Sequence, residues 1–183
     1  MRSNTRDPRL ADPTGIPSGT IFTQTLIHDF DTLNWLNPGA APVSVYAQAG
    51  ALVRPDFADA GLLDTALVTI RYSNGAMAMA DASFQAVYGY DVRAEVFGSG
   101  GLVTAGHQSV DDSVLYGPAG IAIDTARSDT DLLWPSYRDE LAAFAAAVRG
   151  GARTGATGAD ARSALQVALA AIESHATNRP VEI

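Results

Sequence analysis

The chain has 183 residues, of which 47% are hydrophobic, and this length suits one well-cored domain spanning residues 1–183. Its formal charge of −8 and sequence pI near 4.6 disfavour nucleic acid and anionic membrane surfaces as partners. The sequence has neither an apolar run of about 20 residues nor a basic-then-apolar leader. We therefore expect a cytoplasmic protein that binds neither nucleic acid nor membrane.

Two absent residue types exclude several chemistries. There is no cysteine, which excludes disulfides, thiolate zinc sites and cysteine nucleophiles. All twelve basic residues are arginine, so the chain offers no lysine for a Schiff base, a phosphate-binding loop or acid catalysis.

The amino-terminal third predicts a strand and a helix. Residues 1–17 contain Arg6-Asp7-Pro8 and several further prolines, which favour one short strand followed by an irregular segment. A helix is then expected over residues 20–36, because Phe22, Leu26, Phe30 and Leu33 recur at helical spacing. Asn37-Pro38-Gly39 would end it.

The middle of the chain predicts successive strands joined by tight turns. Ser73-Asn74-Gly75 is a hairpin signal, because Asn-Gly accepts the positive φ angles of a two-residue turn. Gly98-Ser99-Gly100-Gly101 predicts another hairpin turn, since strand-like residues and not a helix follow it. The expected strands are 43–53, 64–72, 76–86, 90–98, 101–104, 113–116 and 121–124.

Two helices are predicted to close the chain. Ser136 is a candidate cap for the first, and Thr157 with Asp160 resembles a capping box for the second. Each helix has an apolar stripe; the residues are Tyr137, Leu141, Phe144 and Val148 in the first, and Leu165, Ala168, Leu169 and Ile172 in the second.

These elements predict an α+β fold with an open, mainly antiparallel β-sheet and helices packed on one face. Strands such as residues 76–82 carry little polarity, so we expect the open face to be covered by a second copy in a homo-oligomer.

The first helix carries the main candidate for chemistry. Gln24, His28 and Asp31 recur at helical spacing, and an imidazole on a rigid helix suits proton transfer. The alternative is a structural or surface histidine. A metal site is not expected, because glutamine is a poor ligand and no second histidine lies one turn away. His107 and His175 are interpreted as structural.

Tyr88-Gly89-Tyr90 would place two phenols on one face of a strand, with a glycine between them that allows close approach to the backbone. The alternative is an ordinary aromatic pair on a sheet.

Together these residues resemble the C-terminal domain of the glucose-fructose oxidoreductase, inositol dehydrogenase and rhizopine-catabolism family, most closely its inositol 2-dehydrogenase branch. The similarity rests on the order and spacing of several motifs over nearly the whole chain; they are Arg6-Asp7-Pro8, Ile27-His-Asp-Phe-Asp31, Val87-Tyr-Gly-Tyr-Asp91, Glu95-Val-Phe-Gly-Ser99, Tyr137-Arg-Asp-Glu-Leu141, Thr157-Gly-Ala-Asp160 and Arg179-Pro-Val.

The resemblance implies a two-domain dehydrogenase that uses NAD or NADP, with a Rossmann domain before this one. His28 matches the histidine that takes the hydroxyl proton of a polyol or sugar, and Gln24 stands where relatives carry an aspartate. The catalytic lysine of relatives belongs to the Rossmann domain. The glycine-rich phosphate loop of that domain is also missing here, so this chain alone is expected to bind no cofactor. The remaining matched residues imply substrate binding; they are Asp7, Thr25, Tyr88, Tyr90 and Tyr137.

Two hypotheses follow. The first is the substrate and oligomerisation domain of an inositol- or sugar-type NAD(P)-dependent oxidoreductase. The second is a non-catalytic sugar-binding or assembly module derived from that family, which Gln24 and the missing lysine would allow.

Overall fold

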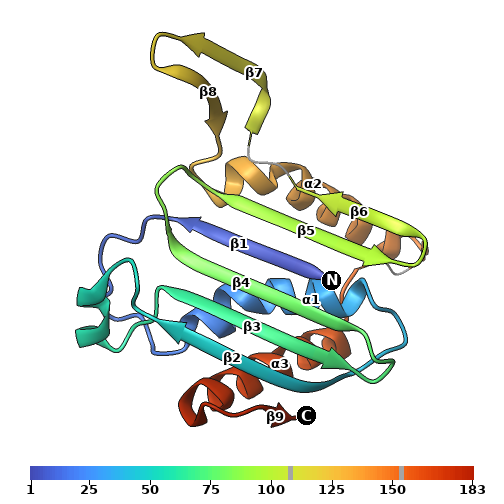
Figure 1. Cartoon of the computed structure of the whole chain (residues 1–183). Coiled ribbons are helices and arrows are strands. Elements are labelled where there is room, and N and C mark those ends of the chain that lie inside the picture. The colour runs from blue at the N-terminus through green and yellow to red at the C-terminus, as the bar shows by residue number, and fades with distance from the viewer. Residues whose placement is uncertain (107–108, 153–154) are drawn as a thin grey trace.

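The computed structural model describes residues 1–106, 109–152 and 155–183, and within them seven strands form one sheet (Figure 1). Their spatial order is β6-β5-β1-β4-β3-β2-β9. The strands are β1 (Arg2–Pro8), β2 (Pro42–Gly50), β3 (Thr65–Tyr72), β4 (Met77–Ala86), β5 (Asp91–Gly98), β6 (Gly101–Ala105) and β9 (Val181–Glu182).

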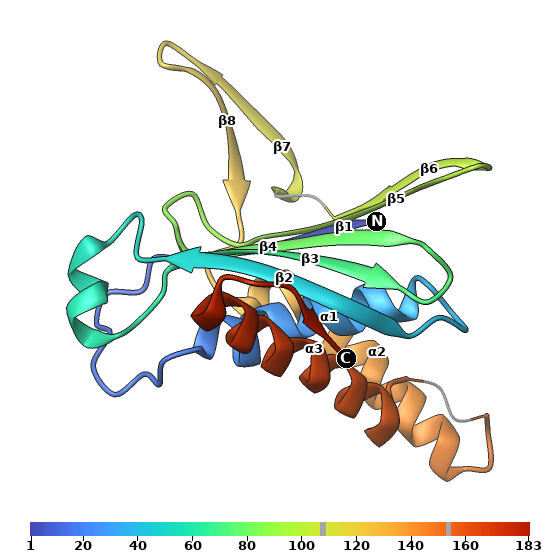
Figure 2. The ribbon, with the colours of Figure 1, turned by 60° about the horizontal axis from the view of Figure 1, so that its bottom comes forward.

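Helices lie on one side of this sheet, and a separate ribbon projects on the other (Figure 2). A π-helical turn (Ile21–Thr25) leads into α1 (Leu26–Trp35), and α2 (Asp129–Val148) and α3 (Gly158–Thr177) follow late in the chain. A short 3₁₀ helix spans Pro55–Ala60. The ribbon consists of β7 (Ser109–Gly117) and β8 (Gly120–Thr125). No helix in the described residues is both long and apolar enough to cross a membrane.

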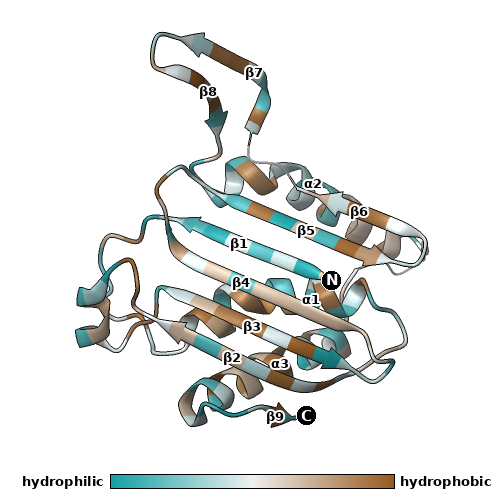
Figure 3. Cartoon of the chain, in the orientation of Figure 1, coloured by the Kyte–Doolittle hydropathy of each residue, from teal (hydrophilic) through white to brown (hydrophobic). Residues whose placement is uncertain are grey.

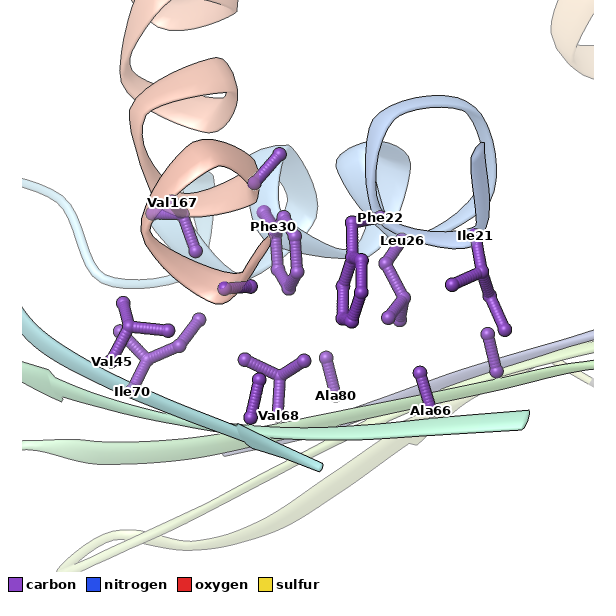
Figure 4. Close-up of a cluster of buried hydrophobic side chains, with 14 of the residues drawn as sticks. Ile21, Phe22, Leu26, Phe30, Val45, Ala66, Val68, Ile70, Ala80 and Val167 are labelled. Carbon is purple, nitrogen blue, oxygen red and sulfur yellow. The ribbon is translucent and has the colours of Figure 1, made fainter. Parts of the chain in front are cut away.

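The core lies between the sheet and the pair α1 and α3. Ala78, Ala80 and Ala82 alternate along β4 toward this core, and small side chains there leave room for the aromatic rings of the first helix. Figure 4 shows these rings against the sheet. The labelled core residues are Ile21, Phe22, Leu26, Phe30, Val45, Ala66, Val68, Ile70, Ala80 and Val167.

The predicted α+β class, the open and mainly antiparallel sheet, and the first helix are confirmed. One pairing differs from the predicted meander, because β1 runs parallel to β4 and antiparallel to β5. The strand predicted to reach Val53 ends at Gly50. Its continuation turns away because the backbone amides of residues 52–54 donate to the buried carboxylate of Asp64.

The helix α2 departs most from the prediction. It begins seven residues before the expected cap Ser136, because the Ser128 hydroxyl accepts from the backbone amide of Asp131 at 3.1 Å. Pro135 lies within the helix. None of its described residues is buried, and the expected apolar stripe is exposed, with Leu141 at 70% and Phe144 at 69%.

The helix α3 has its predicted capping box between Thr157 and Asp160. Its buried face consists mainly of small residues, whereas Leu165 and Leu169 of the predicted stripe are exposed. The prediction chose the larger side chains, but the close approach of α3 to the sheet selects alanines at the contact.

The open face of the sheet carries both polar and apolar side chains. The apolar alternation of β4 points inward, and the outward positions include Asp81, which pairs with Arg6. Exposed apolar residues also lie on this face, namely Met77 of β4 and, at the β5–β6 end, Phe97 and Leu102, which pair across the two strands. Figure 3 shows apolar segments at that end and on the β7–β8 ribbon.

We predict that Asp64→Ala lowers the free energy of unfolding by about 2–4 kcal/mol, because three backbone amides and the Thr65 hydroxyl lose their acceptor. Urea unfolding of the wild type and the variant measures this difference. Asp59→Ala, at an exposed position in the same region, is the control and should change stability by under about 0.5 kcal/mol. Equal effects of the two substitutions would contradict the prediction.

Candidate functional site

The first helix presents its two candidate catalytic residues to solvent. Gln24 lies in the π-helical turn and His28 in the first turn of α1, and both side chains are exposed. Between them, Thr25 and Leu26 are buried and anchor this end of the helix in the core. Asp31 does not join them; it lines a different cavity.

Asp7, at the end of β1, reaches the same helix. The Thr25 hydroxyl donates to the Asp7 carboxylate at 3.2 Å. Desolvation raises the pKa of Asp7, while the Thr25 hydrogen bond and the positive charge of His28 oppose this, and Asp129 adds to it. The carboxylate of Asp7 and the imidazole of His28 therefore interact across the junction of β1 and α1.

Tyr90 joins this group through a close backbone contact. Its amide donates to the Ala126 carbonyl at 2.8 Å, and the preceding Gly89 has φ +114°. A Cβ on Gly89 would lie 2.4 Å from that carbonyl oxygen, so only glycine fits. The predicted close approach is therefore made by the chain's own backbone. Burial, together with the charges of Asp7 and Asp129, raises the pKa of Tyr90 to about 12.

Tyr88 is directed elsewhere. Residues 87–90 form a turn between β4 and β5, not a continuous strand, so the two phenols do not share a face. The Tyr88 hydroxyl donates to Asp91 at 2.8 Å, and Arg93 bonds the same carboxylate. Burial and Asp91 raise the pKa of Tyr88. The structure thus separates Tyr88 from the other predicted substrate residues.

The start of α2 completes the group with one residue that the sequence interpretation missed. The Tyr137 hydroxyl donates to Asp129 at 3.3 Å. Asp129 also interacts electrostatically with Asp7 and Tyr90. The capping pattern of Ser128 and Asp131 could have revealed it, because a helix starting at residue 129 places Tyr137 two turns later on the same side.

Asp29 links the site helix to the sheet. It is 2% exposed, and its carboxylate accepts from the hydroxyls of Ser3 and Thr5 on β1, the latter at 2.8 Å. Desolvation raises the pKa of Asp29 to about 6, although both hydroxyls oppose the shift. The contact fixes α1 against β1, the strand that carries Asp7.

Two cavities flank this region. His28 lines one of about 230 Å³ together with Ser3, Thr5 and residues of β5. A larger cavity of about 540 Å³ lies near the other end of α1 and is lined by Asp31 but by none of the other predicted site residues. We therefore locate the candidate site by its chemistry and not by cavity size.

The described residues hold no cluster of three or more His, Cys, Asp or Glu side chains suited to a metal. They instead bring together polar groups of several kinds, namely the imidazole of His28, the carboxylates of Asp7 and Asp129, the phenols of Tyr90 and Tyr137, and the hydroxyl of Thr25. Such groups can hydrogen-bond a polyhydroxylated ligand and accept a proton. His107 lies outside the described residues, and His175 packs its ring against Phe22, with centroids 6.3 Å apart.

This fold and this site define an α+β domain with polar and titratable side chains gathered where a strand meets a helix. Residues 13–183 match the model of the oxidoreductase family's C-terminal alpha/beta domain. The chain therefore belongs to the glucose-fructose oxidoreductase, inositol dehydrogenase and rhizopine-catabolism family, as its motifs predicted.

The curated relatives of this chain include oxidoreductases and inositol dehydrogenases. The chain is 38% identical over its whole length to the uncharacterized oxidoreductase YrbE of Bacillus subtilis, of which it covers 54%. It is 34% identical to scyllo-inositol 2-dehydrogenase (NAD(+)) of the same organism, over 91% of this chain and 48% of that protein. The chain thus spans about half the length of the curated relatives that it matches.

Solved structures show the same fold. A myo-inositol dehydrogenase from Corynebacterium glutamicum superposes with a TM-score of 0.89 at 30% identity, over all of this chain and 55% of that one. The similarity includes the whole helix and sheet arrangement described above.

We predict that Asp29 makes stability depend on pH. Because its pKa is about 6 in the folded protein and 3.8 in the unfolded chain, the folded state holds the proton more tightly. Stability from this group is full below the unfolded pKa of 3.8 and is lost as the pH rises through 6, by about 3 kcal/mol in total once the pH reaches about 8. The free energy of unfolding is measured across this pH range for the wild type and for Asp29→Asn. The difference between the two proteins isolates the contribution of Asp29. A difference that stays constant with pH would contradict it; Asp31→Asn is the control.

Proposed function

We propose that this chain is the substrate-binding part of an NAD-dependent dehydrogenase acting on inositol or a related polyol. The observation that carries the proposal is the meeting of His28, Asp7, Tyr90 and Tyr137 in a chain whose relatives bear inositol dehydrogenase names. NAD is favoured over NADP because the named coenzyme of one relative is NAD(+). In this proposal residues 1–183 act as one domain.

Different residues of this chain bind the substrate and accept its proton. Asp7, Thr25, Tyr90 and Tyr137 hold the hydroxyl groups of the polyol by hydrogen bonds, and His28 accepts the proton of the hydroxyl being oxidised. Bound nicotinamide would supply the hydride acceptor. The described residues offer no glycine-rich strand-to-helix loop for its phosphates, so the cofactor would be held by a further part of the enzyme.

The exposed stripe of α2 supports the presence of such a further part. A helix of 20 residues with no fully buried side chain gains little packing energy to stabilise it, and Trp134, Leu141, Phe144 and Val148 are all at least 66% exposed. The same helix carries Tyr137, so a domain that covers the stripe would also approach the candidate site.

The alternative is a non-catalytic sugar-binding or assembly module. Its supporting observation is Gln24, an exposed amide where relatives are expected to carry a carboxylate. A module of this kind would bind polyols but would not oxidise them.

We predict that His28 is required for turnover. The test protein is a chimera in which the amino-terminal part of Bacillus subtilis YrbE precedes this chain. His28→Ala should lower kcat for inositol by about 10²- to 10⁴-fold, the usual contribution of a positioned acid-base group, with NAD affinity unchanged. His175→Ala is the control, because that ring packs against Phe22 away from the site. A chimera that binds NAD and inositol but oxidises no polyol would favour the alternative.

We further propose that the open face of the sheet joins copies of this chain. Phe97 and Leu102 are exposed there by 76% and 55%, and covering them would remove apolar surface from water.

The matching prediction is that the purified protein forms dimers or tetramers, and that Phe97→Asp weakens them at least about tenfold in dissociation constant. Trp35→Asp is the control, because Trp35 is an aromatic residue of equal exposure, 76%, on the helix side. Light scattering over a concentration series measures both. A wild type that stays monomeric, or a loss of assembly only in Trp35→Asp, would refute the proposed interface.

A further inference from the structure

We propose that Asp7 balances the positive charge of His28 during proton transfer, taking the part of a carboxylate that position 24 lacks. This inference rests on the proposed function and names a positioning residue within it. It is specific to the geometry of this chain, because Asp7 belongs to β1 while position 24 belongs to the helix.

Position 24 cannot supply the charge. Gln24 lies one turn before His28, and an amide can hold an imidazole by a hydrogen bond but cannot balance an imidazolium. An anion near an imidazole stabilises its protonated form, so a carboxylate from another element would supply this charge if His28 accepts the substrate proton.

The charged groups around His28 leave Asp7 as the best placed. Asp29 is the next residue on α1, but it is buried and bound to Ser3 and Thr5. Asp31 lines a different cavity. Arg93 of β5 shares the smaller cavity with His28 and pairs with Asp91.

Asp7 is held by the helix that carries His28. Its carboxylate accepts from Thr25, three residues before His28, and residues at this spacing are neighbours on a helix surface. Thr25 is buried, so the bond fixes Asp7 to a rigid part of the helix. The charge of His28 in turn favours the ionised form of Asp7 and lowers its pKa, against the desolvation that raises it.

The first residue of α2 adds to the same field. Asp129 accepts from the Tyr137 hydroxyl and raises the pKa of Asp7 by like-charge repulsion. Tyr90 lies near both carboxylates. Of Asp7 and Asp129, Asp7 is the carboxylate with a direct hydrogen bond to the site helix.

The first experiment uses the chain by itself. Carboxyl-selective NMR titration should show that His28→Ala raises the pKa of Asp7, because the favourable charge is removed. Because linkage is reciprocal, the same coupling acts on the imidazole. His175→Ala should leave the titration of Asp7 unchanged. An unchanged Asp7 titration in His28→Ala would overturn the inference, whether or not the protein proves to be an enzyme.

The second experiment uses the chimera with the amino-terminal part of YrbE. Asp7→Asn should lower kcat at least about tenfold and move the acidic limb of the kcat/KM profile to lower pH, because the proton on the base is held less tightly. Adding Gln24→Asp to Asp7→Asn should restore both the rate and the position of the limb.

A residue that only binds substrate gives a different result. In that case Asp7→Asn would raise KM, leave the acidic limb in place and not respond to Gln24→Asp. That pattern would overturn the inference while leaving the proposed function intact. An inactive wild-type chimera that binds NAD would instead contradict the proposed function, and the NMR titration would still decide the coupling.

Discussion

The buried contact between Asp29 and the hydroxyls of Ser3 and Thr5 determines where the candidate site lies. It ties α1 to the parallel strand β1, and both elements supply site residues at their adjoining ends. A carboxylate at 2% exposure is costly unless its bonds are satisfied, so this contact holds a single register between helix and strand. Asp7 and His28 meet because that register is fixed.

Local sequence patterns were sufficient to predict most of the helices and strands. The spacing of Phe22, Leu26 and Phe30 predicted the first helix and its buried face, and Asn74-Gly75 predicted the β3–β4 hairpin. These features depend on residues close in sequence, so periodicity and turn preference suffice to find them. The same is true of the capping box at Thr157.

Contacts between distant segments were not predictable in the same way. The parallel pairing of β1 with β4 joins residues over seventy positions apart, as in the pair Arg2 and Met79. Tyr88 and Tyr90 separate because Gly89 admits the Ala126 carbonyl, a partner that no local pattern indicates. The sequence interpretation missed Asp129 because it placed the cap of α2 at Ser136, eight residues after the observed cap Ser128.

The exposed stripe of α2 bears on the central claim that this domain works against another part of a longer enzyme. Hydrogen exchange measured in the chain alone and in the chimera with the YrbE amino-terminal part tests that claim most directly. We predict that the α2 amides around Leu141 and Phe144 exchange at least about tenfold more slowly in the chimera, while those of the β7–β8 ribbon do not change. Unchanged exchange across α2, in a chimera that binds NAD, would contradict the account.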